Sequence, residues 1–205
     1  CRDRIRLRDG AGFRGVVACS GNANACTGKQ GEADALAMTS LAAKASSIGD
    51  DRSFLVASTG VIGRLLPFGL VETGIRKAGT SLAGTHAALD QAAQAIMTTD
   101  TLPKAISRQV QVNGRTVTIT GMAKGAGMIQ PNMATMLSFI ATDAKIEQTL
   151  LQQCLADAVE QSFNRISVDG DTSTNDACVL MASGCSRVPE IKSGSQSHLI
   201  FAEAV

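Results

Sequence analysis

Residues 110–122 carry the pattern that most restricts the fold of this chain. In VQVNGRTVTITGM, apolar and polar side chains alternate on either side of the dipeptide Asn113-Gly114. Alternation with a period of two is typical of a strand with one buried face, and Asn-Gly between two such runs is the strongest short signal for a two-residue hairpin. The sequence therefore predicts an antiparallel pair of strands, whose second strand leads into KGAG at residues 124–127.

The other apolar runs indicate strands that alternate with helices. Buried strands are expected at residues 13–19, 54–58 and 136–141. Helices are expected at residues 27–45, 67–77, 86–97 and 145–164, the first capped by Thr27 with Gln30 behind it and the second closed by Gly79. The final run, HLIFAEAV, is expected to begin a strand. This alternation indicates an α/β fold but does not choose its topology.

Composition excludes several classes of function. The chain has 205 residues, a formal net charge of +1 and no uninterrupted run of Lys or Arg, so a nucleic-acid or anionic membrane surface is not expected. No apolar run approaches the roughly 20 residues of a membrane span, and CRDRIRLRDG is charged where a signal peptide is hydrophobic. We expect a cytoplasmic protein whose six cysteines, which form no CxxC pair, are reduced and mostly buried thiols.

Two loops resemble ligand-binding motifs but fail on spacing. Six residues separate Gly21 from Gly28-Lys29, where a phosphate-binding P-loop has four. Residues 169–176, DGDTSTND, have Thr174 where a calcium loop needs glycine and Leu180 where it needs glutamate. We expect no metal site, and we interpret DGDTSTND as a network of Asx turns that braces a loop.

Histidine-based catalysis has little support in the sequence. His86 and His198 are the only histidines, and neither belongs to an HExxH or GxSxG motif. We interpret both as surface or capping residues.

Thr135 is the better candidate nucleophile. It follows Ala134 in PNMATML, behind small and turn-prone residues. A threonine inside a chain has no base of its own, whereas a threonine at a new N-terminus carries an α-amine with a pKa of roughly 7.7–8.0 beside its hydroxyl. Cleavage before Thr135 would therefore create both a nucleophile and its base.

Two further polar segments have alternative interpretations. Thr59-Gly60, after the predicted strand at 54–58, could offer a hydroxyl and a backbone N–H to an oxyanion, or could simply be a strand-to-helix turn. The run TTDT at residues 98–101 could cap a helix, or could line a polar pocket.

Five segments, in order, closely resemble the ornithine acetyltransferase family of arginine biosynthesis, also called glutamate N-acetyltransferase. They are SGNANACTGKQGEADA, VASTGVIGRLLP, AIMTTDTLPK, MAKGAGMIQPNMATMLSFIATDA and DGDTSTNDA. The matches run from about residue 15 to residue 182, and PNMATML is the most specific of them.

The resemblance implies a self-cleaving precursor with an α/β fold. The fold would be a layered α/β sandwich with N-terminal-nucleophile-like geometry, of which residues 1–205 are part of one domain and a fragment of a chain about twice as long. Cleavage between Ala134 and Thr135 would leave residues 1–134 in a first subunit and residues 135–205 at the start of a second. The two cleaved subunits would assemble as a heterotetramer.

The resemblance also implies a reaction and the residues that perform it. Acetyl would pass from N2-acetylornithine to glutamate through an ester on Thr135, without a cofactor. Thr59 and Gly60 would form the oxyanion hole, and Thr98, Lys124 and Thr135 would bind substrate. Three alternatives remain open: an enzyme that also takes acetyl from acetyl-CoA, an N-terminal-nucleophile amidohydrolase or aminopeptidase, and an unprocessed binding protein that keeps the fold.

Overall fold

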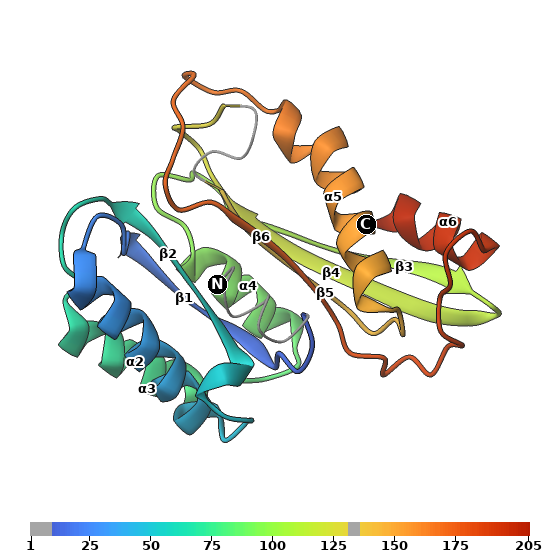
Figure 1. Ribbon diagram of the computed structural model, residues 1–205, viewed down its shortest axis with the longest axis horizontal. Helices are drawn as coiled ribbons and strands as arrows, with labels where there is room; N and C mark the ends of the chain where they lie inside the picture. Colours follow the sequence, from blue (N-terminus) through green and yellow to red (C-terminus); the bar gives the residue numbers. More distant parts are fainter. Residues whose placement is uncertain (1–9, 131–135) are drawn as a thin grey trace. The chain divides into compact units, whose positions relative to one another are not determined.

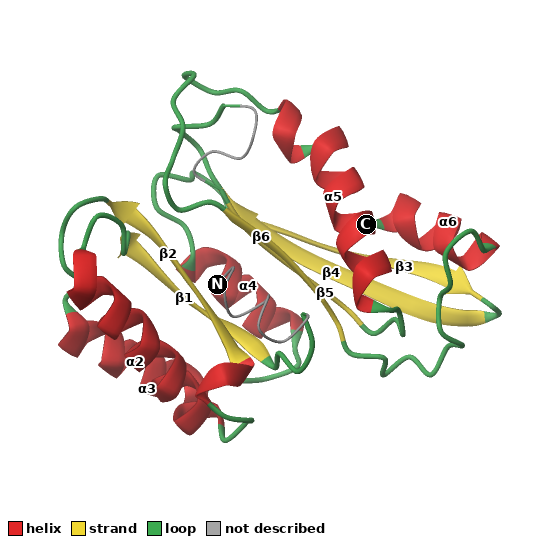
Figure 2. Ribbon diagram, in the orientation of Figure 1, coloured by secondary structure: helices red, strands yellow, loops and turns green. Residues whose placement is uncertain are grey.

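The computed structural model describes residues 10–130 and 136–205 (Figure 1). Its contacts divide the chain into two compact units, Cys1–Pro103 and Lys104–Val205. Both units contain helices and strands, as Figure 2 shows. The predicted cleavage bond therefore lies inside the second unit and not at the boundary between the units.

The first unit is built on two parallel strands. Strand β1 (Gly15–Asn22) pairs with β2 (Phe54–Val61), which follows the short 3-10 helix η1 (Asp51–Ser53). Helices α2 (Gly28–Ser46) and α3 (Phe68–Thr80) pack against each other, and α4 (His86–Ala95) follows them in the chain. The core of this unit comprises Val17, Met38, Ala42, Ala43, Phe54, Leu66 and Ile75.

Two details of the helices in the first unit differ from the expectation. Gly79 does not end a helix but lies inside α3, where a Cβ atom would come within 2.5 Å of the Ala45 Cβ of α2. Its missing side chain is what lets the two helices approach. Thr27 precedes α2 but makes no side-chain cap; its hydroxyl instead donates to Asn24 Oδ1 at 2.6 Å.

The second unit contains a four-stranded mixed sheet in the order β3-β4-β5-β6. Strands β3 (Lys104–Val112), β4 (Arg115–Lys124) and β5 (Leu137–Thr142) are antiparallel neighbours, and β6 (Ala177–Ala182) runs parallel to β5. The predicted hairpin is confirmed: Val112 pairs with Arg115, and Asn113 and Gly114 have φ of 51° and 74°. Positive φ at both loop residues is the requirement of a type I′ turn.

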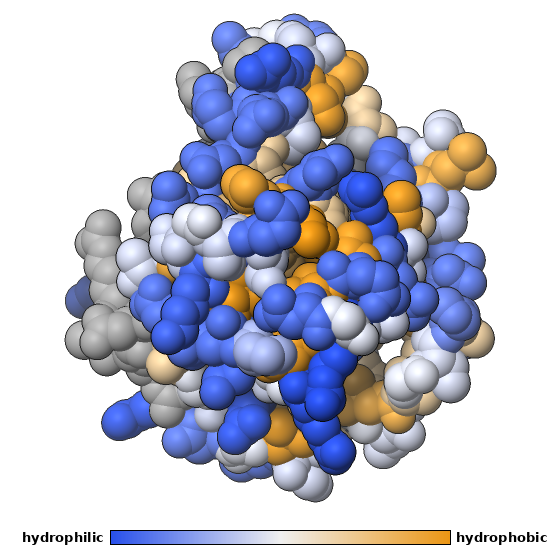
Figure 3. Space-filling view, turned by 90° about the vertical axis from the view of Figure 1, so that its right-hand side faces the viewer, coloured by the Kyte–Doolittle hydropathy of each residue, from blue (hydrophilic) through white to orange (hydrophobic). Residues whose placement is uncertain are grey.

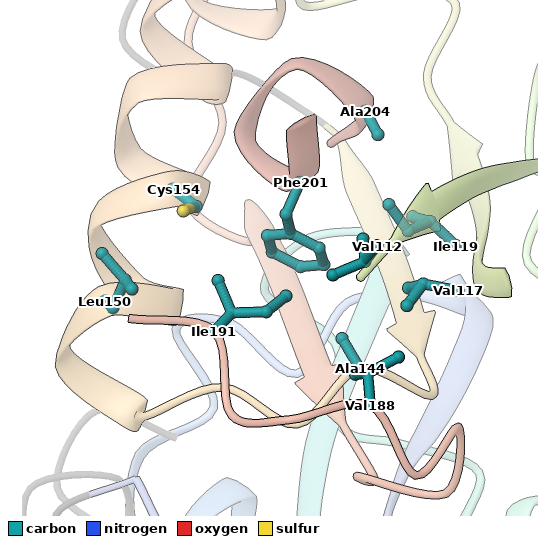
Figure 4. Packing of buried hydrophobic residues seen from close by; sticks show 10 residues of the cluster. All are labelled: Val112, Val117, Ile119, Ala144, Leu150, Cys154, Val188, Ile191, Phe201 and Ala204. Atoms are coloured by element: carbon teal, nitrogen blue, oxygen red, sulfur yellow. The ribbon is translucent and has the colours of Figure 1, made fainter. Parts of the chain in front are cut away.

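Helices α5 (Gln148–Gln161) and α6 (Gln196–Ala204) close the core of the second unit against the sheet (Figure 4). A short 3-10 helix, η2 (Phe163–Arg165), follows α5. Phe201 of α6 is fully buried and lies among apolar side chains from the sheet and the loops. The labelled cluster comprises Val112, Val117, Ile119, Ala144, Leu150, Cys154, Val188, Ile191, Phe201 and Ala204.

The expectation of a strand at HLIFAEAV is wrong, because this run forms most of α6. Ser195 begins the helix as its N-cap, and its hydroxyl accepts a hydrogen bond from His198 N at 3.1 Å. Phe201 and Ala204, three positions apart, both reach the core, which is helical spacing and not the alternation of a strand. His198 is thus a capping-turn residue, as interpreted from the sequence.

On the face drawn in Figure 3, hydrophilic residues predominate and interrupt the hydrophobic ones. Within residues 10–130 and 136–205, no helix combines the length and the apolar character that a membrane span requires. The five described cysteines are free thiols, but only Cys154 is buried, whereas Cys26 and Cys185 are exposed. The expectation of mostly buried thiols is therefore wrong for this part of the chain.

Candidate active site

Thr59 and Gly60 lie inside β2, next to its end, and not in a turn after a shorter strand. In the parallel pair, Thr59 is opposite Ser20 and Gly60 is opposite Gly21. Thr59 is 3% exposed. Gly60 has φ of +126°, and a Cβ atom there would come within 2.3 Å of the Gly21 carbonyl carbon. Only glycine can occupy this position, because both its backbone conformation and the space beside it exclude a side chain.

Hydrogen bonds among the last residues of β1 and β2 and the loops that follow them fix this strand end. Ser58 Oγ accepts from Asn24 N at 2.8 Å, beside Thr59. Three further bonds join the two chain segments: Ala23 N to Val61 O at 2.9 Å, Gly63 N to Ala25 O at 3.0 Å, and Asn22 Nδ2 to Arg64 O at 3.0 Å. Backbone donors held in this way need no rearrangement when a negative charge develops, which is the requirement of an oxyanion hole.

Thr98 belongs to a segment that is tied to the same strand end. Ser20, the partner of Thr59, donates its hydroxyl hydrogen bond to the carbonyl of Ala95, the last residue of α4. Thr98 follows as an exposed residue, and its N–H donates to Oδ2 of the buried Asp100 at 3.4 Å. This bond supports the turn interpretation of TTDT. The exposed Thr98 lies three residues after Ala95, which Ser20 of β1 binds.

Lys124 is the last residue of β4, and its side chain is 1% exposed. Lysine is almost never buried this completely without a polar or charged partner, because desolvating an ammonium group is costly. Its cross-strand partner is Leu137, the first residue of β5. Residue 137 lies two positions after Thr135, so the sheet places Lys124 opposite the strand that Thr135 precedes.

Ala134 and Thr135 lie outside the described residues, in the gap at 131–135. The chain on both sides of this gap is described, and the loop at residues 169–176 binds residues on each side. Asp169 accepts from Met128 N and Ile129 N, at 2.8 Å and 3.2 Å. Asp176 Oδ1 accepts from Met136 N at 3.0 Å. The sequence indicated a bracing loop here, but the bonded positions are about 40 residues away along the chain, and nothing in the local pattern could identify them.

Three of the five described thiols are poor alternatives to threonine as the nucleophile. Burial raises the pKa of Cys19 and of Cys178. Burial, and secondarily the carboxylate of Asp157, raise the pKa of Cys154. Since the thiolate is the reactive form, the raised pKa makes these three side chains weaker nucleophiles at neutral pH. Among residues 10–130 and 136–205, no group of three or more His, Cys, Asp or Glu is arranged to hold a metal ion.

Comparison with known proteins decides the family. The profile of the ArgJ family matches residues 1–205. The chain belongs to the ArgJ family. The family resemblance and the α/β fold class predicted from the sequence are confirmed. The fold also matches a solved ArgJ structure, the arginine biosynthesis bifunctional protein argJ from Bacillus halodurans, with a TM-score of 0.58 and 41% identity. That match covers 65% of this chain and 67% of the other.

Curated ArgJ relatives match almost the whole chain. This chain is 51% identical to the arginine biosynthesis bifunctional protein ArgJ from Symbiobacterium thermophilum over 193 residues. The match covers 94% of this chain and 47% of that protein. The mitochondrial ArgJ protein of Arthroderma otae is 49% identical over 199 residues, which are 95% of this chain and 42% of that protein. The chain thus spans less than half the length of these two relatives.

Proposed function

We propose that the protein containing this chain transfers acetyl from N2-acetylornithine to glutamate through an ester on Thr135. The observation that carries the proposal is the match of all 205 residues to the ArgJ family, whose curated relatives are named for arginine biosynthesis. Ala134-Thr135, Lys124 and Thr59-Gly60 occupy the positions that the family resemblance assigns to chemistry. The tightly fixed strand end at Gly60 supports the oxyanion role further.

In the proposed reaction, the Thr135 hydroxyl attacks the acetyl carbonyl of N2-acetylornithine while the Thr135 α-amine takes the hydroxyl proton. The oxyanion accepts hydrogen bonds from the Thr59 hydroxyl and the Gly60 N–H, each worth a factor of roughly 10²–10³ in rate. The carbon–nitrogen bond then breaks, ornithine leaves with the proton, and acetyl-threonine remains. The amine of glutamate attacks this ester, which releases N-acetylglutamate and restores the hydroxyl.

Lys124 and Thr98 would bind the substrates. Both N2-acetylornithine and glutamate carry an α-carboxylate, which an ammonium group can recognise as a point charge. Lys124→Ala should therefore raise KM for both substrates by roughly 10- to 100-fold, the size of a lost charge-assisted hydrogen bond. Lys145→Ala, at an exposed lysine after β5, serves as the control and should leave both KM values unchanged. An unchanged KM in the Lys124 variant would remove the lysine from substrate binding.

The sheet supports the proposal that the cleaved pieces stay together. Cleavage at Ala134–Thr135 would put β4 in the first subunit and β5 in the second. These strands pair over the whole of β5, from Lys124 opposite Leu137 to Ile119 opposite Thr142. A cut in the connection breaks none of these pairs, so we propose that the two subunits remain one folded body and assemble further into a heterotetramer.

A second activity is supported by the word bifunctional in the names of the relatives. We propose that acetyl-CoA also acylates Thr135, so that the enzyme makes N-acetylglutamate from acetyl-CoA and glutamate. The test is an assay with acetyl-CoA and glutamate in the absence of N2-acetylornithine. Formation of N-acetylglutamate supports the second activity, and no product rejects it. In a separate assay with N2-acetylornithine alone, release of acetate without glutamate would indicate an amidohydrolase.

The remaining parts of the proposal concern cofactors and location. Thr135 supplies both nucleophile and base, so we propose that catalysis needs no cofactor, and activity should survive dialysis against a metal chelator.

We also propose a cytoplasmic location, which the free thiols of the described cysteines support. Three of the relatives are named as mitochondrial, so fractionation of the source cells is the measurement that decides.

The intact mass of the full-length gene product, measured under denaturing conditions beside a Thr135→Ala variant, tests the main proposal. We expect two polypeptides, the second beginning at Thr135, and a single uncut chain in the variant. The cut protein should also form ornithine from N2-acetylornithine and glutamate. An uncut wild-type chain would mean that Thr135 never gains its free amine, and the binding-protein alternative would replace the acetyltransferase.

A further inference from the structure

Two carboxylates from one loop hold the chain on both sides of residues 131–135. Asp169 and Asp176 bracket the DGDTSTND loop. Asp169 accepts from the N–H groups of Met128 and Ile129, before the gap, and Asp176 accepts from that of Met136, after it. All three bonds join a side-chain carboxylate to backbone about 40 positions away in the sequence, so they are not local turn contacts.

Backbone bonds reinforce each carboxylate. Beside Asp176, Ala177 N donates to the carbonyl of Met136 at 3.0 Å, so both backbone groups of Met136 are held by neighbouring residues. Beside Asp169, Ile129 N and Val168 O are 3.0 Å apart, and Val168 N donates in return to Ile129 O. Described residues before and after the gap at 131–135 are therefore fixed to the same loop.

The conformation on the Asp169 side carries backbone strain. Met128 has φ of 54° and Asp169 has φ of 60°, values in the left-handed region that residues with a side chain seldom adopt. Such residues persist only where surrounding contacts determine them, and they concentrate at functional sites. Here the carboxylate of one of these residues accepts the N–H of the other at 2.8 Å, so the bond joins the two left-handed positions directly.

We propose that Asp169 and Asp176 are positioning residues for self-cleavage, which fix the two ends of the segment that contains Ala134 and Thr135. The inference rests on the proposed function. In the cleavage step, the Thr135 oxygen bonds to the Ala134 carbonyl carbon, the Ala134–Thr135 amide bond breaks, and the Thr135 nitrogen takes the hydroxyl proton. Water then hydrolyses the ester, which gives the Ala134 carboxylate and restores the Thr135 hydroxyl.

The physical reason lies in the geometry of intramolecular attack. Rate depends steeply on the placement of the reacting atoms, and a misplacement of about 1 Å can cost roughly 100-fold. Met136 N is bonded directly to Thr135, so the Asp176 bond fixes the amide that follows the nucleophile. The Asp169 bonds fix the chain that leads to the scissile carbonyl from the other side.

The two carboxylates should differ in what they do after the cut. Met136 stays attached to Thr135 as the second residue of the new subunit, so the Asp176 bond continues to hold the nucleophile during turnover. Met128 and Ile129 belong to the other piece and no longer constrain Thr135. Loss of Asp176 should therefore slow both cleavage and acetyl transfer, whereas loss of Asp169 should slow mainly cleavage.

The experiment follows the rate of self-cleavage in the full-length protein by intact mass, for Asp169→Ala, Asp176→Ala and Asp176→Asn. Each Ala variant should cleave at least about 10-fold more slowly than the wild type. Asp176→Asn should restore most of the rate, because its amide oxygen can still accept from Met136 N. Asp171→Ala is the matched control: Asp171 is an exposed carboxylate of the same loop and should be without effect.

Two readouts separate positioning from mere stability. Each variant is also made in the Thr135→Ala background, where every chain stays uncut, and its melting temperature should stay within a few degrees of the Thr135→Ala parent. In the cleaved fraction of Asp176→Ala, kcat should fall more than KM rises. Should Asp176→Ala fail to fold, Asp176→Glu keeps the charge and moves the acceptor by one methylene; slow cleavage of the folded Glu variant supports the proposal.

Cleavage at the wild-type rate in both Ala variants, or in a folded Asp176→Glu, would overturn the positioning role. That outcome is distinct from failure of the proposed function, which would appear as an uncut wild-type protein or as a Thr135→Ala variant that is still cut.

Discussion

The strand end at Gly60 and the chain around residues 131–135 are held by different means. At Gly60, main chain meets main chain, and the space left for a side chain is closed by Gly21. Around the predicted cleavage bond, two carboxylates reach in from a separate loop. The proposed oxyanion hole has only to stabilise a negative charge, so it can be rigid from the start. A segment that is cut once needs anchors outside the bond that breaks.

Gly60→Ala should break the rigid region and give the largest effect. The new Cβ atom would lie 2.3 Å from the Gly21 carbonyl carbon in a backbone conformation suited to glycine alone. We expect a loss of roughly 2–6 kcal/mol of stability from strain and overpacking, and a fall of roughly 10²–10³ in kcat. Thermal unfolding and the acetyl-transfer assay measure the two.

Gly63→Ala is the control for this variant. Gly63 also has positive φ, +78°, but nothing lies within 4 Å of a Cβ atom there. It should lose only about 1–2 kcal/mol of stability, from the left-handed conformation alone. Equal losses of stability in the two glycine variants would mean that the contact with Gly21 contributes nothing to the effect.

Phe201→Ala should separate stability from positioning in the second unit. Phe201 is fully buried in the cluster of Figure 4, away from both carboxylate anchors in the sequence. Its loss should cost about 3–5 kcal/mol. Denaturant unfolding measures the cost, with the exposed Leu199→Ala as control. Cleavage in the folded fraction should continue near the wild-type rate; cleavage as slow as in Asp176→Ala would reduce the carboxylate effect to stability.

Ser58→Ala should weaken the rigid region only slightly. It removes the bond from Asn24 N to Ser58 Oγ at 2.8 Å and leaves the backbone contacts in place. We expect a loss of about 1 kcal/mol in thermal unfolding and a change in kcat of less than about 10-fold. A loss of activity as large as in Gly60→Ala would show that side chains, and not the main chain, hold this strand end.

Glu147 is a carboxylate anchor without a proposed role in cleavage. Its replacement, Glu147→Gln, should have the smallest effect. Glu147 accepts from Thr149 N and Leu150 N, which together with its other contacts lower its pKa. A lowered folded pKa means that the stabilisation is present above the unfolded pKa and is lost as pH falls through the folded value. Wild type should be more stable than the variant at pH 7, and the difference should vanish in acid.

The measurement is thermal unfolding of both proteins across that pH range, with the cleavage rate at pH 7 beside it. Cleavage should be unchanged, since this anchor caps α5 and does not flank residues 131–135. A gap in stability that widens in acid would contradict the assigned pKa direction.

The elements that could be predicted from the sequence depend on short-range patterns. The hairpin at Asn113-Gly114 was predictable because its turn chemistry lies in two adjacent residues. The final helix was mistaken for a strand because its apolar residues are contiguous, and only the core contacts of Phe201 and Ala204 reveal the period.

Features of the site that depend on distant residues could not be predicted. Thr59 and Gly60 could be proposed from their chemistry, but the need for glycine at position 60 arises from Gly21 on another strand. The bonds of Asp169 and Asp176 depend likewise on partners in other elements. The position of Thr135 stays a prediction, since it lies outside the described residues.

The pairing of β4 with β5 also determines which cleaved pieces stay together. If the chain is cut between these strands, each first piece keeps the second piece with which it was synthesised, because exchange would require the sheet to unfold. In a cell that makes two versions of the protein, the halves of different precursors should not mix. Stoichiometry is then one to one without any control of expression, and a defect in either half stays with the molecule in which it arose.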